Sequence, residues 1–152
     1  MDLGCSPGSW LLYAAELAGK DGYVTGIDLV PLKIKTPSNS KVYTADIFSL
    51  DDDLRALVGN NINAVISDMA PATTGQKGMD AVRSFHLSMA ALTLAREVMV
   101  HGGNFVCKIF QGEEFEEFIN SVKDEFRNHK IFKPMSSRKA SKEIYVIGKG
   151  KK

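Results

Sequence analysis

Short apolar segments alternate with segments of helical periodicity along the whole chain, and this alternation constrains the fold more than any other feature. Strand-like runs alternating with amphipathic helices are typical of a mostly parallel sheet with helices on both faces. The 152 residues contain no repeat or low-complexity linker and fit one domain, residues 1–152. The sequence therefore predicts an α/β fold with seven strands.

The expected elements follow from apolar periodicity and from breaker residues. The first strand ends near Leu3, and the others cover about 23–28, 41–45, 62–67, 104–109, 130–132 and 143–148. The expected helices cover about 9–17, 49–58, 79–101 and 115–126, and Gly102 with Gly103 is expected to stop the third of them.

Three strands that lie far apart in the sequence carry a chemically reactive residue at one end: Asp68, Lys108 and Glu143. Because ligands collect beyond the carboxyl ends of the parallel strands in an open α/β sheet, we expect these residues to converge on one cleft. Lys108 as a neutral amine could remove a hydroxyl proton, while Asp68 orients it and Glu143 hydrogen-bonds Lys108 or the substrate. The alternative for Lys108 is a surface lysine whose charged end reaches solvent.

The segment after the first strand has the plan of a nucleotide-binding turn, because Gly4 and Gly8 lie between that strand and a helix. Its glycine spacing is not that of a dinucleotide site, and Pro7 removes one amide donor from the loop. Both features disfavour a nicotinamide-dependent oxidoreductase.

Acids follow three successive strands, at Asp28, Asp46 and Asp68. Asp28 is placed to hold ribose hydroxyls, and Asp46 is placed to accept a hydrogen bond from an exocyclic amine. A cleft lined by three carboxylates suits a cofactor without phosphates and with a positive centre, such as the sulfonium of S-adenosylmethionine. The alternative is that these acids are turn or helix-capping residues.

The formal net charge of +1 hides a basic C-terminal region, since residues 129–152 carry eight bases against the single acid Glu143. Such a region can neutralise RNA phosphates at the mouth of the cleft, or it can be a solvated lysine-rich surface. The residues expected to contact RNA are Lys133, Arg138, Lys139 and Lys142.

Six motifs occur in order over practically the whole chain. They are Asp-Leu-Gly-Cys-Ser-Pro-Gly-Ser-Trp, Gly-Ile-Asp-Leu, Ala-Asp-Ile, Ser-Asp-Met-Ala-Pro, Cys-Lys-Ile-Phe and Ser-Lys-Glu-Ile-Tyr-Val. Together they resemble the FtsJ-type (RrmJ-like, RlmE) ribosomal RNA 2′-O-methyltransferases. The resemblance implies a Rossmann-like seven-stranded methyltransferase fold with one antiparallel strand. It also implies S-adenosylmethionine contacts in the glycine loop around Gly4 and at Gly8, Trp10, Asp28, Asp46 and Asp68.

The resemblance further implies methyl transfer to a ribose 2′-hydroxyl of ribosomal RNA, on uridine. The catalytic set of the family is Lys-Asp-Lys-Glu, and its last three members match Asp68, Lys108 and Glu143. The first lysine of the set lies upstream of the glycine loop, and this sequence begins inside that loop motif. We therefore expect an N-terminally shortened form of the family, whose activity is the open question. A noncatalytic RNA-binding or ribosome-assembly protein with the same fold is the alternative.

Two cysteines, Cys5 and Cys107, offer neither metal-site spacing nor a disulfide framework, and the sequence shows no long apolar run or signal peptide. These features predict a monomeric cytoplasmic protein that does not associate with a membrane. In a eukaryote the expected location is mitochondrial or nucleolar.

Overall fold

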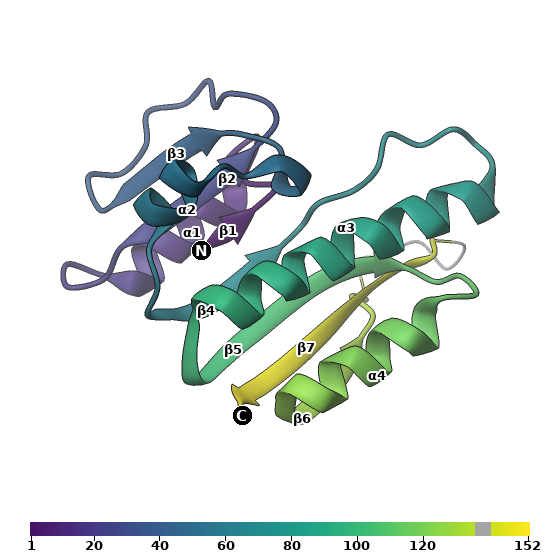
Figure 1. Cartoon of the computed structure of the whole chain (residues 1–152). Coiled ribbons are helices and arrows are strands. Elements are labelled where there is room, and N and C mark those ends of the chain that lie inside the picture. The colour runs from purple at the N-terminus through teal and green to yellow at the C-terminus, as the bar shows by residue number, and fades with distance from the viewer. Residues whose placement is uncertain (136–140) are drawn as a thin grey trace.

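The computed structural model describes residues 1–135 and 141–152, and its strands form one sheet in the order β3-β2-β1-β4-β5-β7-β6 (Figure 1). The strand β7 is antiparallel to both of its neighbours, and the other neighbouring strands are parallel. The predicted seven-stranded, mostly parallel sheet with one antiparallel strand is therefore confirmed. The strands are β1 (Asp2–Leu3), β2 (Val24–Asp28), β3 (Ser40–Thr44), β4 (Ile62–Ser67), β5 (Met99–Phe110), β6 (Phe126–Phe132) and β7 (Glu143–Lys151).

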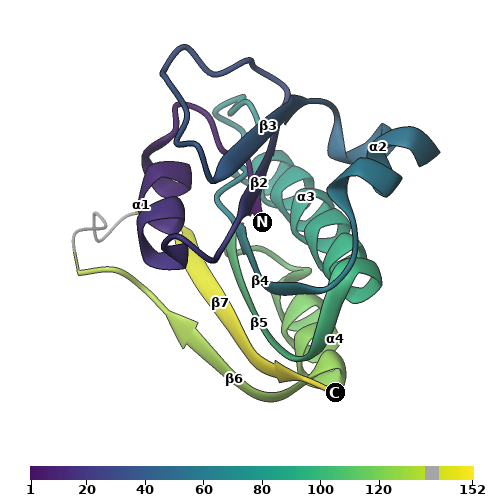
Figure 2. The same cartoon turned by 90° about the vertical axis from the view of Figure 1, so that its left-hand side faces the viewer.

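Helices cover both faces of the sheet, as predicted (Figure 2). One face carries α1, and the other carries α2, α3 and α4. None of the helices among the described residues combines the length and the apolar character needed to cross a membrane. The helices are α1 (Ser9–Ala18), the 3-10 turn η1 (Ile47–Ser49), α2 (Asp52–Val58), α3 (Lys77–Val98) and α4 (Phe115–Glu125).

The larger core lies between the sheet and α2, α3 and α4, where Phe105, Phe118 and Leu92 are fully buried. In α4, Phe118, Ile119 and Val122 turn toward this core while the acids of the helix face outward, which is the predicted amphipathic pattern. A smaller cluster lies beneath α1 and includes Leu11 and Ala15.

The junction between α3 and β5 differs from the prediction. The helix ends at Val98, and β5 begins at Met99, so Gly102 and Gly103 lie inside a strand instead of terminating a helix. Gly102 has φ +81°, and a Cβ on Gly103 would lie 3.0 Å from the carbonyl oxygen of Asn63 on the neighbouring chain segment. These glycines accommodate a register shift between β4 and β5, which starts at the pair Ile62–Met99.

Strand register brings the reactive residues to one edge of the sheet. Leu3 pairs with Ser67, and Ser67 pairs with Cys107, so Gly4, Asp68 and Lys108 all follow at the same level. Because β7 is antiparallel, its first residues reach this edge too, and Tyr145 lies opposite Lys108.

Candidate active site

A pocket of about 380 Å³ opens at this edge of the sheet, which is a common size for a small-molecule site. Its walls come from the carboxyl ends of β1, β2 and β4, from η1 and its preceding residues, and from Leu87 of α3. Four of the predicted cofactor-binding residues line it: Gly4, Asp28, Asp46 and Asp68.

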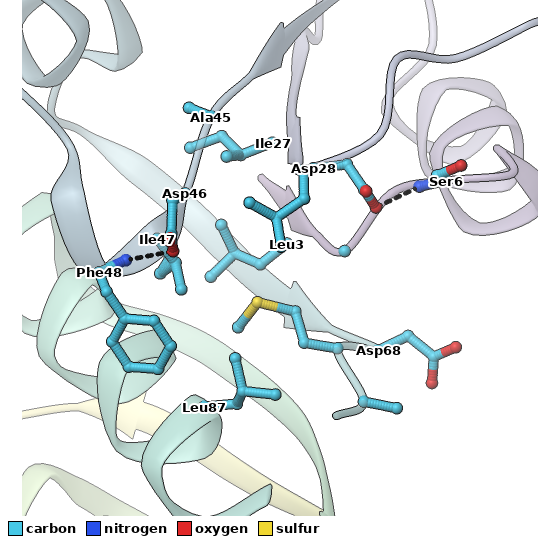
Figure 3. A pocket seen from close by; sticks show the side chains of 14 residues that line it. Leu3, Ser6, Ile27, Asp28, Ala45, Asp46, Ile47, Phe48, Asp68 and Leu87 are labelled. Carbon is cyan, nitrogen blue, oxygen red and sulfur yellow. Dashed lines mark hydrogen bonds between the residues drawn. The ribbon is translucent and has the colours of Figure 1, made fainter. Parts of the chain in front are cut away.

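The two ends of the pocket differ in chemistry (Figure 3). Ile47, Phe48 and Leu87 form an apolar end, while the carboxylates of Asp28 and Asp68 lie toward the other end. An elongated ligand with a flat apolar group at one end and polar or cationic groups at the other is complementary to this arrangement.

Two of the acids line the pocket and also stabilise turns. Both of the roles considered for them from the sequence therefore apply. Asp28 accepts the backbone N–H of Ser6 at 2.8 Å and that of Val30 at 2.8 Å. Asp46 caps η1 by accepting the N–H of Phe48 at 2.9 Å. An ionised carboxylate has about four acceptor positions, so each side chain can still accept hydrogen bonds from a ligand.

The glycine loop passes close to the strand ends. Gly4 has φ +78°, and a Cβ there would lie 2.8 Å from Cγ of Met69, so a larger residue would be strained and would clash. Gly8 precedes α1 and packs against Ile34 rather than lining the pocket. Trp10 is also absent from the pocket wall, because its ring stacks on Tyr145 with 5.7 Å between the ring centroids.

Lys108, Asp68 and Tyr145 form a connected cluster beside the pocket. Lys108 Nζ donates to the Asp68 carbonyl oxygen at 2.7 Å and lies 3.1 Å from Asp68 Oδ1. The hydroxyl of Tyr145 donates to the same Oδ1 at 2.8 Å. Burial, the hydrogen bond to Asp68 and the nearby negative charges raise the pKa of Tyr145 above its ordinary value, so the phenol remains a donor. Lys108 is almost fully buried, which excludes the surface-lysine alternative.

Glu143 lies two residues before Tyr145 in β7, so both side chains project from the same face of the strand. Its carboxylate accepts a hydrogen bond from Ser141 Oγ at 3.3 Å. Among the described residues, Lys108 pairs with Asp68 and forms no ion pair with Glu143. Of the two roles expected for Glu143, the hydrogen bond to Lys108 is therefore not formed in this structure, and the contact with the substrate stays a prediction.

The structure describes two of the four residues that were expected to bind RNA. Lys133 is exposed, but its ammonium donates to the Ser141 carbonyl at 2.8 Å and links the ends of β6 and β7. Lys142 is exposed beside Glu143. Arg138 and Lys139 lie outside the described residues.

Two polar residues of this region were not selected from the sequence. Tyr145 could have been found by its strand spacing, since it shares a face with Glu143. No pattern in the sequence indicated Asp2, because it lies inside the first strand, one residue before the part of the chain that lines the cleft. It is fully buried, and burial, assisted by Asp68 and Asp28 and opposed by the Met1 ammonium, raises its pKa to about 7.

The model of the FtsJ-like methyltransferase family matches residues 1–151. The chain belongs to this family. It is 59% identical over 152 residues to the ribosomal RNA large subunit methyltransferase E of Desulforapulum autotrophicum, covering all of this chain and 75% of that protein. It is 51% identical to the protein of the same name from Desulfosudis oleivorans, covering 73% of that protein.

Solved methyltransferases of low sequence identity share the fold of this FtsJ-like chain. Aeropyrum pernix fibrillarin, solved with bound S-adenosylmethionine, matches with a TM-score of 0.67 at 15% identity, over 97% of this chain and 64% of fibrillarin. Human methyltransferase-like protein 13, solved with S-adenosylhomocysteine, matches with a TM-score of 0.71 at 12% identity, over 97% of this chain and 69% of that one. At these identities the likeness concerns the fold alone.

Proposed function

We propose that this chain transfers the methyl group of S-adenosylmethionine to a ribose 2′-hydroxyl of ribosomal RNA. The observation that carries the proposal is the Lys108–Asp68 pair, which lies at the edge of an acid-lined pocket in an FtsJ-like methyltransferase. An RNA methyltransferase needs a cofactor site and a proton acceptor next to each other, and this edge of the sheet supplies both.

The pocket fits S-adenosylmethionine in shape and charge. Ile47, Phe48 and Leu87 would hold the adenine ring at the apolar end, and Asp46 would accept from its exocyclic amine. Asp28 would hold the ribose hydroxyls of the cofactor, and Asp68 lies where the methionine portion would follow. The acids balance the positive charge of a sulfonium, and no lysine, arginine or histidine lines the pocket to pair with a pyrophosphate.

When bound, S-adenosylmethionine supplies an electrophilic methyl group. The residues of the chain must then hold the 2′-oxygen of the substrate in line and take its proton. We assign the proton to Lys108 Nζ, because Asp68 holds this atom in place from two sides, through its carbonyl oxygen and Oδ1. To accept the proton, the amine must be neutral in the reacting complex. Tyr145 fixes the carboxylate of Asp68 in turn. Glu143 would hydrogen-bond the ribose of the substrate. The alignment of the 2′-oxygen with the methyl group supplies much of the rate enhancement.

RNA would approach along the end of β7 and the segment before it. Lys142 is exposed beside Glu143, and Lys133 is exposed at the end of β6. Arg138 and Lys139 belong to the same basic run of the sequence. Contacts between lysine or arginine and phosphate are independent of base sequence, so they would position the strand without selecting the nucleotide.

The decisive experiment measures the transfer of labelled methyl groups from S-adenosylmethionine to ribosomal RNA by the native chain and by Lys108→Met. General-base catalysis contributes about 10²- to 10⁴-fold, so we expect the variant to lose activity by a factor in this range. Its affinity for S-adenosylhomocysteine, measured by calorimetry, should change by less than about threefold, because the adenosine contacts remain.

Lys20→Met is the matched control, since Lys20 is exposed in the turn after α1. It should transfer methyl groups at the native rate. Digestion of the product RNA to nucleosides must yield 2′-O-methylated ribose. Methylation of a base, or equal rates for the native chain and Lys108→Met, would contradict the proposal. Cofactor binding without any transfer would favour the noncatalytic RNA-binding role.

We also propose that residues 1–152 act as one domain and as a monomer. The support is the single sheet, in which β1 pairs with β4 and β4 pairs with β5, joining the first half of the chain to the second. Light scattering at micromolar concentration tests the monomer, and a molecular mass of twice the chain would contradict it.

A further inference from the structure

The β4–α3 loop, residues 68–76, takes part in the site described above only through its first residues. Asp68, Met69 and Ala70 line the pocket, and residues 72–76 are exposed beyond it. Figure 1 shows the loop leading from the end of β4 to the start of α3. The position of its exposed part relative to Lys108 therefore depends on how the far end of the loop is held.

Asp80 of α3 holds that far end. Its Oδ1 accepts the backbone N–H and the side-chain hydroxyl of Thr74, both at 2.9 Å. The hydroxyl oxygen of Thr74 in turn accepts the N–H of Gln76 at 3.2 Å. Asp80 is buried, although all of residues 72–79 are exposed. The backbone hydrogen bond from Thr74 is the main cause that lowers the pKa of Asp80, so the carboxylate is ionised at neutral pH and its hydrogen bonds are charge-assisted.

The next residue of α3 contacts the loop that follows β5. A Cβ on Gly112 would lie 2.5 Å from Cβ of Ala81, so the backbone of Gly112 packs directly against this helix. One residue earlier, the N–H of Gln111 donates to the carbonyl of Lys142 at 2.9 Å, next to Glu143. The first turns of α3 therefore connect the β4–α3 loop to the segments after β5 and before β7, which carry the other predicted catalytic residues.

The β4–α3 loop is adjacent to the place where the RNA must bind. Methyl transfer requires the 2′-oxygen of the substrate between the cofactor and Lys108, and the pocket wall formed by this loop ends at Ala70. The exposed part of the loop follows directly, and it offers the hydroxyl of Thr73 and the amide of Gln76 as hydrogen-bonding groups. Such groups can hold a ribose or a phosphate without reading the base.

We propose that Asp80 is a positioning residue for methyl transfer, which holds the β4–α3 loop in the conformation that binds the target ribonucleotide and places its 2′-hydroxyl at Lys108. The inference rests on the proposed function, because it requires an RNA substrate at this edge of the sheet. Asp80 acts through Thr74 and does not touch the substrate. Cofactor binding does not depend on it, since Tyr145 and Lys108 hold Asp68 at the start of the loop.

The test compares Asp80→Ala with the native chain in single-turnover methyl transfer over a range of ribosomal RNA concentrations. Misplacement of the reacting groups by about 1 Å can cost about a hundredfold, so we expect the rate at saturating RNA to fall by about 10- to 100-fold. The affinity for S-adenosylhomocysteine, measured by calorimetry, should change by less than about twofold. Asp80→Asn keeps an acceptor oxygen for Thr74 and should lose less activity than Asp80→Ala, because a neutral hydrogen bond remains.

Thr74→Val removes the hydroxyl from the other side of the same contact, so it tests the proposal even if Asp80→Ala does not fold. Its rate at saturating RNA should also fall, and the change should add little to Asp80→Ala, because both variants remove one shared contact. Asp51→Ala is the matched control. Asp51 caps α2 by accepting the N–H of Leu54 at 2.7 Å, and it does not line the pocket. This variant should transfer methyl groups at the native rate.

A native rate at saturating RNA for Thr74→Val and for a folded Asp80→Ala would overturn the proposal. An equal loss of rate and of cofactor affinity, or the same loss of rate in Asp51→Ala, would overturn it too, since the effect would then be a general loss of structure. A native chain that transfers no methyl group to RNA would contradict the proposed function itself, which is a different failure.

Discussion

Tyr145 joins two parts of the site, Trp10 and Asp68, that lie 58 residues apart in the sequence. Its ring stacks on Trp10 of α1, and its hydroxyl donates to Asp68 after β4. Tyr145→Phe keeps the stack and removes the donor. We expect the methyl-transfer rate to fall by about tenfold, because Asp68 loses a charge-assisted hydrogen bond that fixes it against Lys108.

Single-turnover kinetics with saturating RNA measure this effect, and cofactor affinity should remain near the native value. Trp10→Leu is the matched variant, since it removes the stack and keeps the hydroxyl. A native rate for Tyr145→Phe would mean that Lys108 alone holds Asp68 in place.

Asp2 makes the stability of the ligand-free protein depend on pH with a definite sign. Its pKa is about 7 in the folded protein, against about 3.9 in an unfolded chain. Between these values the folded state binds more protons at this position, so the carboxyl lowers the free energy of unfolding as pH rises. Asp2→Asn lacks this effect.

Thermal melts of both proteins from pH 5 to pH 8 test the sign. The melting temperature of Asp2→Asn minus that of the native chain should increase across this range. The Met1 ammonium, Asp28 and Asp68 surround Asp2 in both proteins, so they alter the size of the difference and not its sign. A difference that is constant with pH would contradict the raised pKa.

At the residue scale, the rule that ligands bind beyond parallel strand ends was enough to select Asp28, Asp46, Asp68 and Lys108. It could not place Trp10, because a ring in the first turn of a helix can face the pocket or a neighbouring strand. Only the position of β7 beside β5 decides that question. Asp2 was missed for a related reason, since its burial depends on α1 and two flanking strands.

At the scale of elements, α3 provides hydrogen-bond partners for β5 beyond the point where β4 ends. Beyond Ser67, β5 continues without a strand partner on that side, and two serines of α3 satisfy its backbone. The N–H of Phe110 donates to Ser84 Oγ at 2.9 Å, and Ser88 Oγ donates to the Lys108 carbonyl at 3.1 Å. These contacts fix the backbone on both sides of the Lys108 side chain.

Ser84→Ala should therefore lower the free energy of unfolding by about 1–3 kcal/mol, because a partly buried N–H loses its acceptor. Urea denaturation measures the change. Thr93→Ala, at an exposed position of the same helix, controls for altered helix propensity and should change stability by less than about 0.5 kcal/mol. Equal stabilities for Ser84→Ala and the native chain would show that water replaces the serine.

Element identities followed from the sequence more reliably than element boundaries. The apolar stripe of α4 is a strong local signal, and α4 appears where it was expected. The end of α3 was misplaced because Gly102 and Gly103 are typical helix terminators. Tertiary contacts decide otherwise: Met99 pairs with Ile62, and the Lys151 ammonium binds the carbonyls of Arg96 and Met99. No local pattern contains this information.

At the scale of the molecule, the pocket is lined by the ends of β1, β2 and β4 and by Leu87 of α3, all parts of one sheet-and-helix core, so a bound ligand should stabilise the whole fold. S-adenosylhomocysteine at 100 times its dissociation constant adds about 2.7 kcal/mol, which corresponds to a rise in melting temperature of roughly 5–10 °C for a domain of this size. Differential scanning fluorimetry measures it. NAD at the same concentration should give no shift, and a shift with NAD alone would favour the oxidoreductase reading.

The order of the last two strands has a consequence for how the chain folds during synthesis. β6 leaves the ribosome before β7, yet β7 lies between β5 and β6 in the finished sheet. Until Glu143–Lys151 has emerged, β5 has a free edge and β6 has no neighbour to pair with. Because Glu143 and Tyr145 emerge first and pair with Phe110 and Lys108, the free edge of β5 persists longest near Asn104, where unwanted pairing between chains would begin.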